Sequence, residues 1–357
     1  MLNKKENMRI VLFCENKYAI DILYPIQTEA EREGDNSVLW YVHKKKIPEF
    51  PLSSGVKWTN SMQEIYNFQP EAIFVPGNIV PYYLPGVKIQ IFHGYAAEKK
   101  DHWIIRHYFD TYFTQGPYFT QKFTQLSKKY KDFEVLETGW TRQDWIKTHY
   151  HDFDEEKRSL LLKYGKKKIV LYAPTFSPSL TSLPHIMKAL IDLACQKDIL
   201  LLMKFHPLTR QKWVDEYQQM SDCYDNIILV NDFGITKYML MADVMISDTS
   251  STVYEFLLLD KPVITLRTIA KKIYWKNIIS PDELCSAFDE VLHEPQIEAL
   301  RQWIVANYDP YLDGQVARRM LDGARDYIKR YGVPISRSLN IWRKYTSVKA
   351  FGRIERK

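Results

Sequence analysis

Short apolar runs alternate with segments of helical length along nearly the whole chain, and this alternation restricts the fold more than any other feature. In the first half, the apolar runs lie at residues 9–14, 37–42, 71–76, 87–92, 111–115 and 133–139. In the second half, they lie at residues 169–172, 199–205, 227–230, 244–246 and 263–266. Such an alternation predicts βαβ units that build parallel sheets.

A strongly charged stretch between His149 and Lys168 interrupts the alternation, and we place a domain boundary there. We therefore expect a Rossmann-like domain over residues 1–150 and a second one over 151–314. An amphipathic helix at 315–331 and a basic tail are expected over 315–357. The 357 residues suffice for two separate cores. Two such domains facing each other across a cleft describe a GT-B-like α/β fold.

Polar residues follow several of the predicted strands, and ligands of parallel sheets bind beyond the carboxyl ends of the strands. His93 follows the run 87–92, and Gly94 after it permits a close approach of a ligand or a positive φ. This is where a general base would be placed, although a loop histidine bonded to backbone is the alternative. In the second half, Thr175 and the pair His206-Pro207 follow strands in the same way.

A cluster of small polar residues follows the run 244–246, and a segment of helical length comes next. The cluster contains Asp248, Thr249, Ser250 and Ser251. Hydroxyl groups and the unpaired N–H groups of a helix N-terminus can hold a phosphate. Glu255 lies about one turn into the helix, where it could accept hydrogen bonds from a ribose. The stretch predicts a cradle for a nucleotide diphosphate; a Ser/Thr cap on an ordinary buried helix is the alternative.

No metal site is expected from the sequence. The four cysteines are far apart, which excludes a CxxC metal knuckle and a disulfide framework, and we treat them as core thiols. Asp152 and Asp154 form a DxD pattern, which binds a metal and a nucleotide in some glycosyltransferases. The acidic run that continues after Asp154 favours the start of a helix instead.

No run approaches the roughly 18 apolar residues that a membrane-spanning helix needs, and the N-terminus lacks the apolar region of a signal peptide. We therefore expect a cytosolic protein. Residues 327–357 contain nine basic residues and one acidic residue, mixed with aromatic and aliphatic ones. This predicts an interfacial segment on an anionic membrane face, which would make the protein peripheral on the inner face of the cell membrane. A solvated, partly disordered tail is the alternative.

The same basic tail also fits a nucleic-acid-binding protein. The formal charge of the whole chain is +6, and the excess is confined to the tail, so the body is slightly acidic. A duplex binder would carry a basic face on its folded domain. We therefore expect no nucleic-acid partner.

With these residues in place, the chain resembles the CDP-glycerol glycerophosphotransferase family, the teichoic-acid primases and polymerases, over about residues 93–319. Its motifs occur in order, as His93-Gly94, Tyr172 to Thr175, His206-Pro207, Asp248 with Ser250, Ser251 and Glu255, and Asp313-Gly314 with Arg318 or Arg319. The chain lacks the long extra region of the large polymerases, so the likeness is to the short, primase-like members.

Some positions depart from the family motifs. Tyr95-Ala96 replaces Thr-Pro, and Glu98 stands where a Lys is expected, with Lys99 one position later. Phe176 and the two residues after it replace the usual Trp-Arg. The acceptor side of the site is therefore expected to differ from that of wall teichoic acid enzymes.

The resemblance implies transfer of glycerol phosphate from CDP-glycerol to a hydroxyl of a glycan or polyol-phosphate acceptor, with release of CMP and without a metal. His93 would be the base, and His206 would stabilise the phosphates. The residues implied in donor binding are Gly94, Thr175, Pro207, Asp248, Thr249, Ser250, Ser251, Glu255, Arg318 and Arg319. CDP-ribitol or a nucleotide sugar as donor remains open at this point, as do the acceptor and the oligomeric state.

Overall fold

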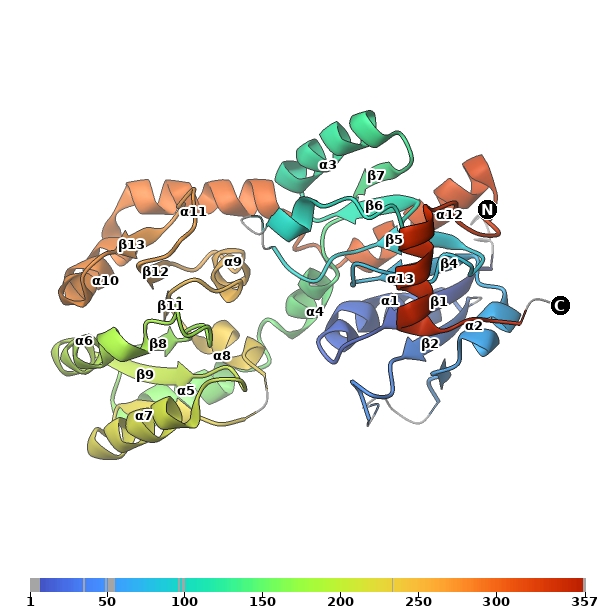
Figure 1. Ribbon diagram of the computed structural model, residues 1–357. Helices are drawn as coiled ribbons and strands as arrows, with labels where there is room; N and C mark the ends of the chain where they lie inside the picture. The colour runs from blue at the N-terminus through green and yellow to red at the C-terminus, as the bar shows by residue number, and fades with distance from the viewer. Residues whose placement is uncertain are drawn as a thin grey trace. The chain divides into compact units, whose positions relative to one another are not determined.

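The computed structural model describes residues 7–34, 36–48, 50, 55–95, 97, 100–232 and 234–355. The chain forms two compact units (Figure 1). Unit 1 comprises Met1–Gly94, Lys99–Thr148 and Tyr308–Lys357, and unit 2 comprises Tyr95–Glu98 and His149–Asn307. The chain thus leaves unit 1 after Thr148 and returns at Tyr308, so the C-terminal segment 315–357 belongs to unit 1.

The sheet of unit 1 is parallel throughout, with seven strands among the described residues in the order β3-β2-β1-β4-β5-β6-β7. The strands are β1 Arg9–Cys14, β2 Ser37–Val42, β3 Trp58–Thr59, β4 Ala72–Val75, β5 Val87–Gln90, β6 Thr111–Thr114 and β7 Glu134–Glu137. β1 lies between β2 and β4, where the order of the strands reverses. This reversal makes the carboxyl ends of β1 and β4 the switch point of the sheet, the usual ligand position in such folds.

Helices cover both faces of the unit 1 sheet. They are α1 Ala19–Glu33, α2 Met62–Phe68, α3 Pro117–Tyr130, α4 Arg142–His149, α12 Val316–Tyr331 and α13 Ile341–Phe351, with a 3-10 turn at Lys100–Trp103. α12 packs beside α1 and over β5 (Figure 1). Gly323 of α12 permits this packing, because a Cβ there would lie 2.3 Å from Leu136 and 3.1 Å from Phe113. On the opposite face, Val348 and Phe351 of α13 are partly buried and pack against the core around Phe13.

Unit 2 repeats the architecture, with six parallel strands among its described residues in the order β10-β9-β8-β11-β12-β13. The strands are β8 Lys168–Tyr172, β9 Ile199–Lys204, β10 Ile227–Val230, β11 Val244–Ser247, β12 Val263–Leu266 and β13 Lys276–Ile278. The helices are α5 Asp154–Tyr164, α6 Leu183–Gln196, α7 Gln211–Cys223, α8 Thr236–Met241, α9 Thr252–Leu257, α10 Leu284–His293 and α11 Pro295–Tyr308, with a 3-10 turn at Pro281–Glu283. The switch point lies between β8 and β11.

The predicted α/β class with two Rossmann-like parallel sheets is confirmed, and every apolar run named from the sequence forms a strand. β3 and β13 are not predicted from the sequence, because they are only two and three residues long and contain polar residues. Asp154 begins helix α5, as expected for the acidic run.

The treatment of all four cysteines as core thiols is wrong, since Cys195 and Cys223 are exposed. Both lie near the ends of helices, away from the buried helical stripes.

The basic tail is ordered over most of its described length, so the alternative of a disordered tail does not describe α13. Arg337 precedes α13 and is partly buried in unit 1, where its guanidinium lies 2.5 Å from the carboxylate of Asp110. Arg330 pairs with Glu134 at 2.9 Å. Two of the basic residues of the tail are thus paired with carboxylates of the same unit, which reduces the charge that the tail offers to a partner. Arg356 and Lys357 lie outside the described residues.

No helix in the described ranges is both long enough and apolar enough to cross a lipid bilayer.

Candidate active site

Asp248 connects the two strands at the switch point of unit 2. It follows β11 and is 1% exposed. One carboxylate oxygen accepts the N–H of Thr175 after β8, and the other accepts the N–H and the hydroxyl of Ser182, each at 2.8 Å. Burial raises the pKa of Asp248, and these hydrogen bonds oppose the rise. The carboxylate therefore holds the loop after β8 against the end of β11 and positions Thr175 beside the hydroxyl cluster.

The hydroxyl cluster lies directly after Asp248. The hydroxyl of Ser250 lies 2.8 Å from that of Thr252, and the hydroxyl of Thr249 accepts the N–H of Ile269 at 3.2 Å. Ser251 is exposed at the position before α9, and its side chain makes no capping hydrogen bond. The alternative of an ordinary Ser/Thr cap therefore does not describe Ser251. Glu255 lies in α9, partly buried, within a turn of Ser251.

His206 is held in a defined orientation and tautomer after β9. Its ring stacks on Phe176, with ring centroids 4.3 Å apart and planes at 27°. The N–H of Leu208, one residue beyond Pro207, donates to Nδ1 of His206 at 3.1 Å. Because Nδ1 is the acceptor, the neutral ring carries its proton on Nε2. Burial lowers the pKa of His206, which favours this neutral form. The exposed edge of the ring is therefore a hydrogen-bond donor.

His93, in unit 1, is held in the opposite tautomer. Its Nδ1 lies 3.0 Å from the carbonyl oxygen of Pro76. A carbonyl only accepts hydrogen bonds, so Nδ1 carries a proton, and in the neutral ring the lone pair is on Nε2. The residue before it, Phe92, has φ +61°, a left-handed conformation that is costly for a bulky residue and is frequent at functional sites. The side chain of Gln115 holds the Gly94 carbonyl at 3.0 Å.

Glu15 at the end of β1 is a site candidate that the sequence analysis missed. Burial raises the pKa of its carboxyl group to about 7, and the charge of Lys46 opposes the rise. Glu15 follows a buried strand, as His93 does, so the same strand-end criterion would have found it. The sequence carries no other signal for Glu15, because a single glutamate after a strand belongs to no motif of the chain.

Arg318 and Arg319 lie on α12 and therefore in unit 1. The guanidinium of Arg319 pairs with Asp313 at 2.6 Å, donates to the carbonyl of Thr138 at 2.8 Å and lies over the ring of Tyr311. Arg318 is half exposed, and its ion pair with Asp322 is long, at 3.9 Å. The guanidinium of Arg319 is thus engaged by residues of unit 1, whereas that of Arg318 is more accessible to a ligand.

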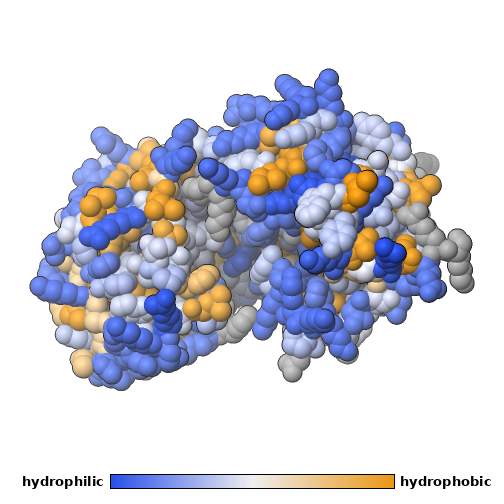
Figure 2. All heavy atoms as spheres, in the orientation of Figure 1, coloured by the Kyte–Doolittle hydropathy of each residue, from blue (hydrophilic) through white to orange (hydrophobic). Residues whose placement is uncertain are grey.

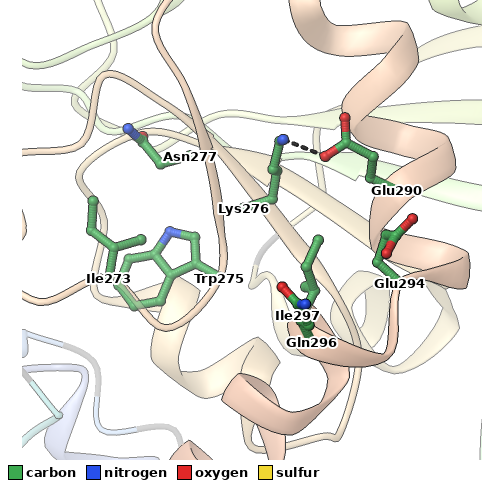
Figure 3. Close-up of a pocket in the computed structure, with 8 residues that line it drawn as sticks. All are labelled: Ile273, Trp275, Lys276, Asn277, Glu290, Glu294, Gln296 and Ile297. Atoms are coloured by element: carbon green, nitrogen blue, oxygen red, sulfur yellow. Dashed lines mark hydrogen bonds and ion pairs between the residues drawn. The ribbon is translucent and has the colours of Figure 1, made fainter.

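A hollow of about 520 Å³ lies elsewhere in unit 2, beside β13 and α10 (Figure 3). Lys276 and Glu290 form an ion pair within it. None of the predicted site residues lines this hollow. It contains no strand-end histidine or hydroxyl cluster, so we place the chemistry at the carboxyl ends of the strands.

Across the described residues, no group of three or more His, Cys, Asp or Glu side chains is arranged to hold a metal ion. The two aspartates of the DxD pattern are 2.6 and 2.8 Å from Nδ1 of His149 and His151. Three of the positions that depart from the family motif, Ala96, Glu98 and Lys99, lie outside the described residues.

Residues 33–323 match the model of the CDP-glycerol:poly(glycerophosphate) glycerophosphotransferase family. The chain belongs to this family. The match spans both units and contains the four strand-end motifs of the site. The resemblance seen in the sequence is thereby confirmed, and members of the family are phosphotransferases.

Two characterised relatives come from Bacillus. The teichoic acid glycerol-phosphate primase of Bacillus subtilis is 27% identical over 206 residues, which cover 54% of this chain and 51% of the primase. The teichoic acid poly(ribitol-phosphate) polymerase of Bacillus spizizenii is 26% identical over 214 residues, which cover 53% of this chain and 33% of the polymerase. The matched region thus spans about half of the primase and a third of the polymerase.

The fold is also that of the wall teichoic acid polymerase TagF. Its solved structure superimposes with a TM-score of 0.63 at 15% identity, covering 90% of this chain and 89% of that chain. At this identity the likeness shows the GT-B-like fold alone.

Proposed function

We propose that this family member transfers glycerol phosphate from CDP-glycerol to a hydroxyl of a lipid-linked glycan or polyol-phosphate acceptor in the synthesis of a cell-surface polymer. The observation that carries the proposal is the pair of strand-end histidines in opposite tautomers, within a chain of this family. One imidazole has a free Nε2 lone pair and the other offers an Nε2–H. A transfer to phosphorus can use a group of each kind, a base for the attacking hydroxyl and a hydrogen-bond donor for the phosphate oxygens.

In the proposed reaction, the acceptor oxygen attacks the β-phosphorus in line, and the bond from that phosphorus to the bridging oxygen of the diphosphate breaks. CMP leaves with the bridging oxygen. Nε2 of His93 takes the proton of the acceptor hydroxyl, a role that contributes ~10²–10⁴-fold to the rate of many enzymes.

The donor lies, in this proposal, at the switch point of unit 2. The Nε2–H of His206 and the hydroxyl groups of Thr175, Ser250 and Ser251 donate to the diphosphate, which is electrostatic stabilisation of the transferring group. Glu255 accepts hydrogen bonds from the ribose. Asp248 acts through Thr175, since its own oxygens are occupied within the unit. Arg318 supplies positive charge to phosphate in preference to Arg319.

The identity of the donor is tested by thermal denaturation with CDP-glycerol, CDP-ribitol, CMP-sialic acid and UDP-sugars. A ligand at one hundred times its Kd stabilises the folded state by about 2.7 kcal/mol, so we expect CDP-glycerol to raise Tm by several degrees. The rise should persist in EDTA, because we propose that no metal is required. A larger rise with CDP-ribitol would favour ribitol phosphate transfer, which the similarity to a ribitol-phosphate polymerase supports as second candidate. No response to either CDP-polyol would contradict the proposal.

We also propose that the outer face of α13 and the segment before it bind an anionic membrane surface, where a lipid-linked acceptor is found. Ile335, Ile341 and Trp342 are 83%, 87% and 70% exposed. Figure 2 shows hydrophobic patches among hydrophilic ones on the face where Figure 1 draws α13. Arg343 and Lys344 follow directly in the helix, and a mixture of aromatic and basic residues suits an anionic interface.

The membrane proposal predicts that Ile341→Glu with Trp342→Glu abolishes sedimentation with phosphatidylglycerol vesicles. Deleting residues 332–357 is a poor test, because it also removes the ion pair of Arg337 with Asp110 and the packing of Phe351 against the core of unit 1. Leu162→Glu, at a site 82% exposed on α5 of unit 2, is the matched control and should sediment like the unmodified chain. Equal sedimentation of the double variant and this control would exclude α13 as a membrane contact.

A further inference from the structure

Glu15 brings a carboxyl group to the switch point of unit 1, and the proposed mechanism does not use it. The residue follows β1, and Gly77 follows the neighbouring strand β4 two residues after its end. A Cβ added at Gly77 would lie 2.3 Å from Oε2 of Glu15. The carboxyl group therefore lies directly over Gly77, in space that is open only because residue 77 has no side chain.

The turn under this carboxyl group is the same turn that orients the base. Nδ1 of His93 bonds to the carbonyl of Pro76, the residue before Gly77. Gln90, the last residue of β5, donates to the carbonyl of Gly77 at 3.1 Å and to the side chain of Asn78 at 3.0 Å. The carboxyl group of Glu15 and the imidazole of His93 thus lie at the same turn, one over Gly77 and the other at the carbonyl of Pro76.

Within the described part of the chain, burial raises the pKa of the Glu15 carboxyl group, the charge of Lys46 opposes the rise, and no hydrogen bond contributes. A partly buried carboxylate without donors is costly, so a position that keeps one needs a compensating reason. Its place at the ligand edge of the sheet supplies that reason. Hydroxyl groups of a bound molecule would donate to it, whereas a phosphate would be repelled.

We propose that Glu15 binds the hydroxyl-bearing end of the acceptor, a sugar or glycerol unit with adjacent hydroxyls, and so presents the attacking hydroxyl to Nε2 of His93. The carboxylate accepts a hydrogen bond from the hydroxyl next to the attacking one. The ring of Tyr18, 5.6 Å from that of His93, offers an apolar surface beside the same position. This inference rests on the proposed transfer reaction and adds the chemical class that the acceptor side recognises.

The test measures transfer by the full chain from CDP-glycerol to two soluble probes, an alkyl-linked glycerol phosphate oligomer and an alkyl glycoside. Glu15→Gln should raise KM for the acceptor about tenfold to one hundredfold, because it removes the charge from the hydrogen bond. The rise of Tm with CDP-glycerol should stay unchanged. Glu71→Gln is the matched control: Glu71 accepts the N–H of Arg9 at the opposite, amino-terminal edge of the same sheet, and its KM should be normal.

Gly77→Ala provides a second variant that keeps the charge. Its φ is not positive, so alanine suits the backbone, but the new methyl group must displace the carboxyl group. We expect a similar rise in acceptor KM, and the double variant should be little worse than either single one, because both act on one contact.

The pH profile separates binding by the carboxylate from a merely structural role. Only the carboxylate form of Glu15 accepts this hydrogen bond, and burial raises the pKa of the Glu15 carboxyl group to about 7. The acceptor kcat/KM should therefore fall as the pH drops through about 7, and this contribution to the pH profile should be lost in Glu15→Gln. The other groups that act on or near this carboxyl are Lys46, Asp21, Tyr18, Tyr41 and Cys14, and all are retained. An acceptor KM within twofold of normal in Glu15→Gln would overturn the inference. Absence of transfer by the unmodified chain would instead overturn the proposed function, and the inference with it.

Discussion

His93→Asn is expected to lower the turnover of glycerol phosphate transfer ~10²–10⁴-fold, the usual contribution of a general base. In the unmodified chain, Nδ1 of His93 lies 3.0 Å from the carbonyl oxygen of Pro76. The amide N–H of asparagine can still donate a hydrogen bond to this carbonyl. It has no basic nitrogen in the place of Nε2. The substitution therefore removes the proton acceptor while keeping the hydrogen bond that orients the loop.

Donor binding should survive this substitution, because the residues proposed to hold the diphosphate, except Arg318, belong to unit 2, and none of them is changed. The measurements are single-turnover transfer and the rise of Tm with CDP-glycerol. His185→Asn, at an exposed histidine of α6, is the control and should transfer normally. Turnover of His93→Asn within threefold of normal, with the donor bound, would show that another group takes the proton.

Arg337→Met is expected to destabilise unit 1 by about 3–5 kcal/mol, the cost of breaking a buried ion pair by removing one partner. The guanidinium is 11% exposed, and it donates to the carboxylate of Asp110 and to the carbonyl groups of His107 and Asp132 at 2.5 Å. Without it, the carboxylate of Asp110 stays buried at 6% exposure. The fully buried Lys88 nearby compensates that charge in part, and burial lowers the pKa of Lys88 to about 8.

Hydrogen exchange of the amides of β5, β6 and α13 measures this loss within unit 1. The exposed pair of Arg330 and Glu134 provides the comparison, because Arg330→Met should cost at most about 1 kcal/mol. Asp110→Asn combined with Arg337→Met should cost less than the sum of the two single changes. Equal protection in Arg337→Met and Arg330→Met would show that the buried pair does not anchor the tail.

The strands and the order of the site residues along the chain are predictable because their signals are local. A buried parallel strand such as β1 is a run of apolar residues, and the residue after it lies at the ligand edge whatever the rest of the chain does. The same rule identifies His93, Thr175 and His206 from sequence. It also applies to Glu15, although no motif includes this residue.

Contacts between distant residues were not predictable, and they change the interpretation of two segments. The sequence predicts a solvated or interfacial basic tail. In the structure, however, Arg337 of this tail forms an ion pair with Asp110, 227 positions away in the chain. The sequence places Asp248 among the residues that bind the nucleotide donor. In the structure, however, its carboxylate oxygens accept hydrogen bonds from residues 66 and 73 positions away. Neither partner is marked by periodicity, because the pairing depends on how strands and loops pack.

By itself, the sequence determined the class of the sheets, the family and the strand-end positions of the two histidines, since apolar patterning and short motifs act over a few residues. Only the tertiary structure decided which nitrogen of each histidine carries the proton. That choice depends on a carbonyl at Pro76 in one case and an N–H at Leu208 in the other. It also decided that the carboxyl group of Glu15 lies over Gly77, because the turn after β4 meets β1 only once the sheet is formed.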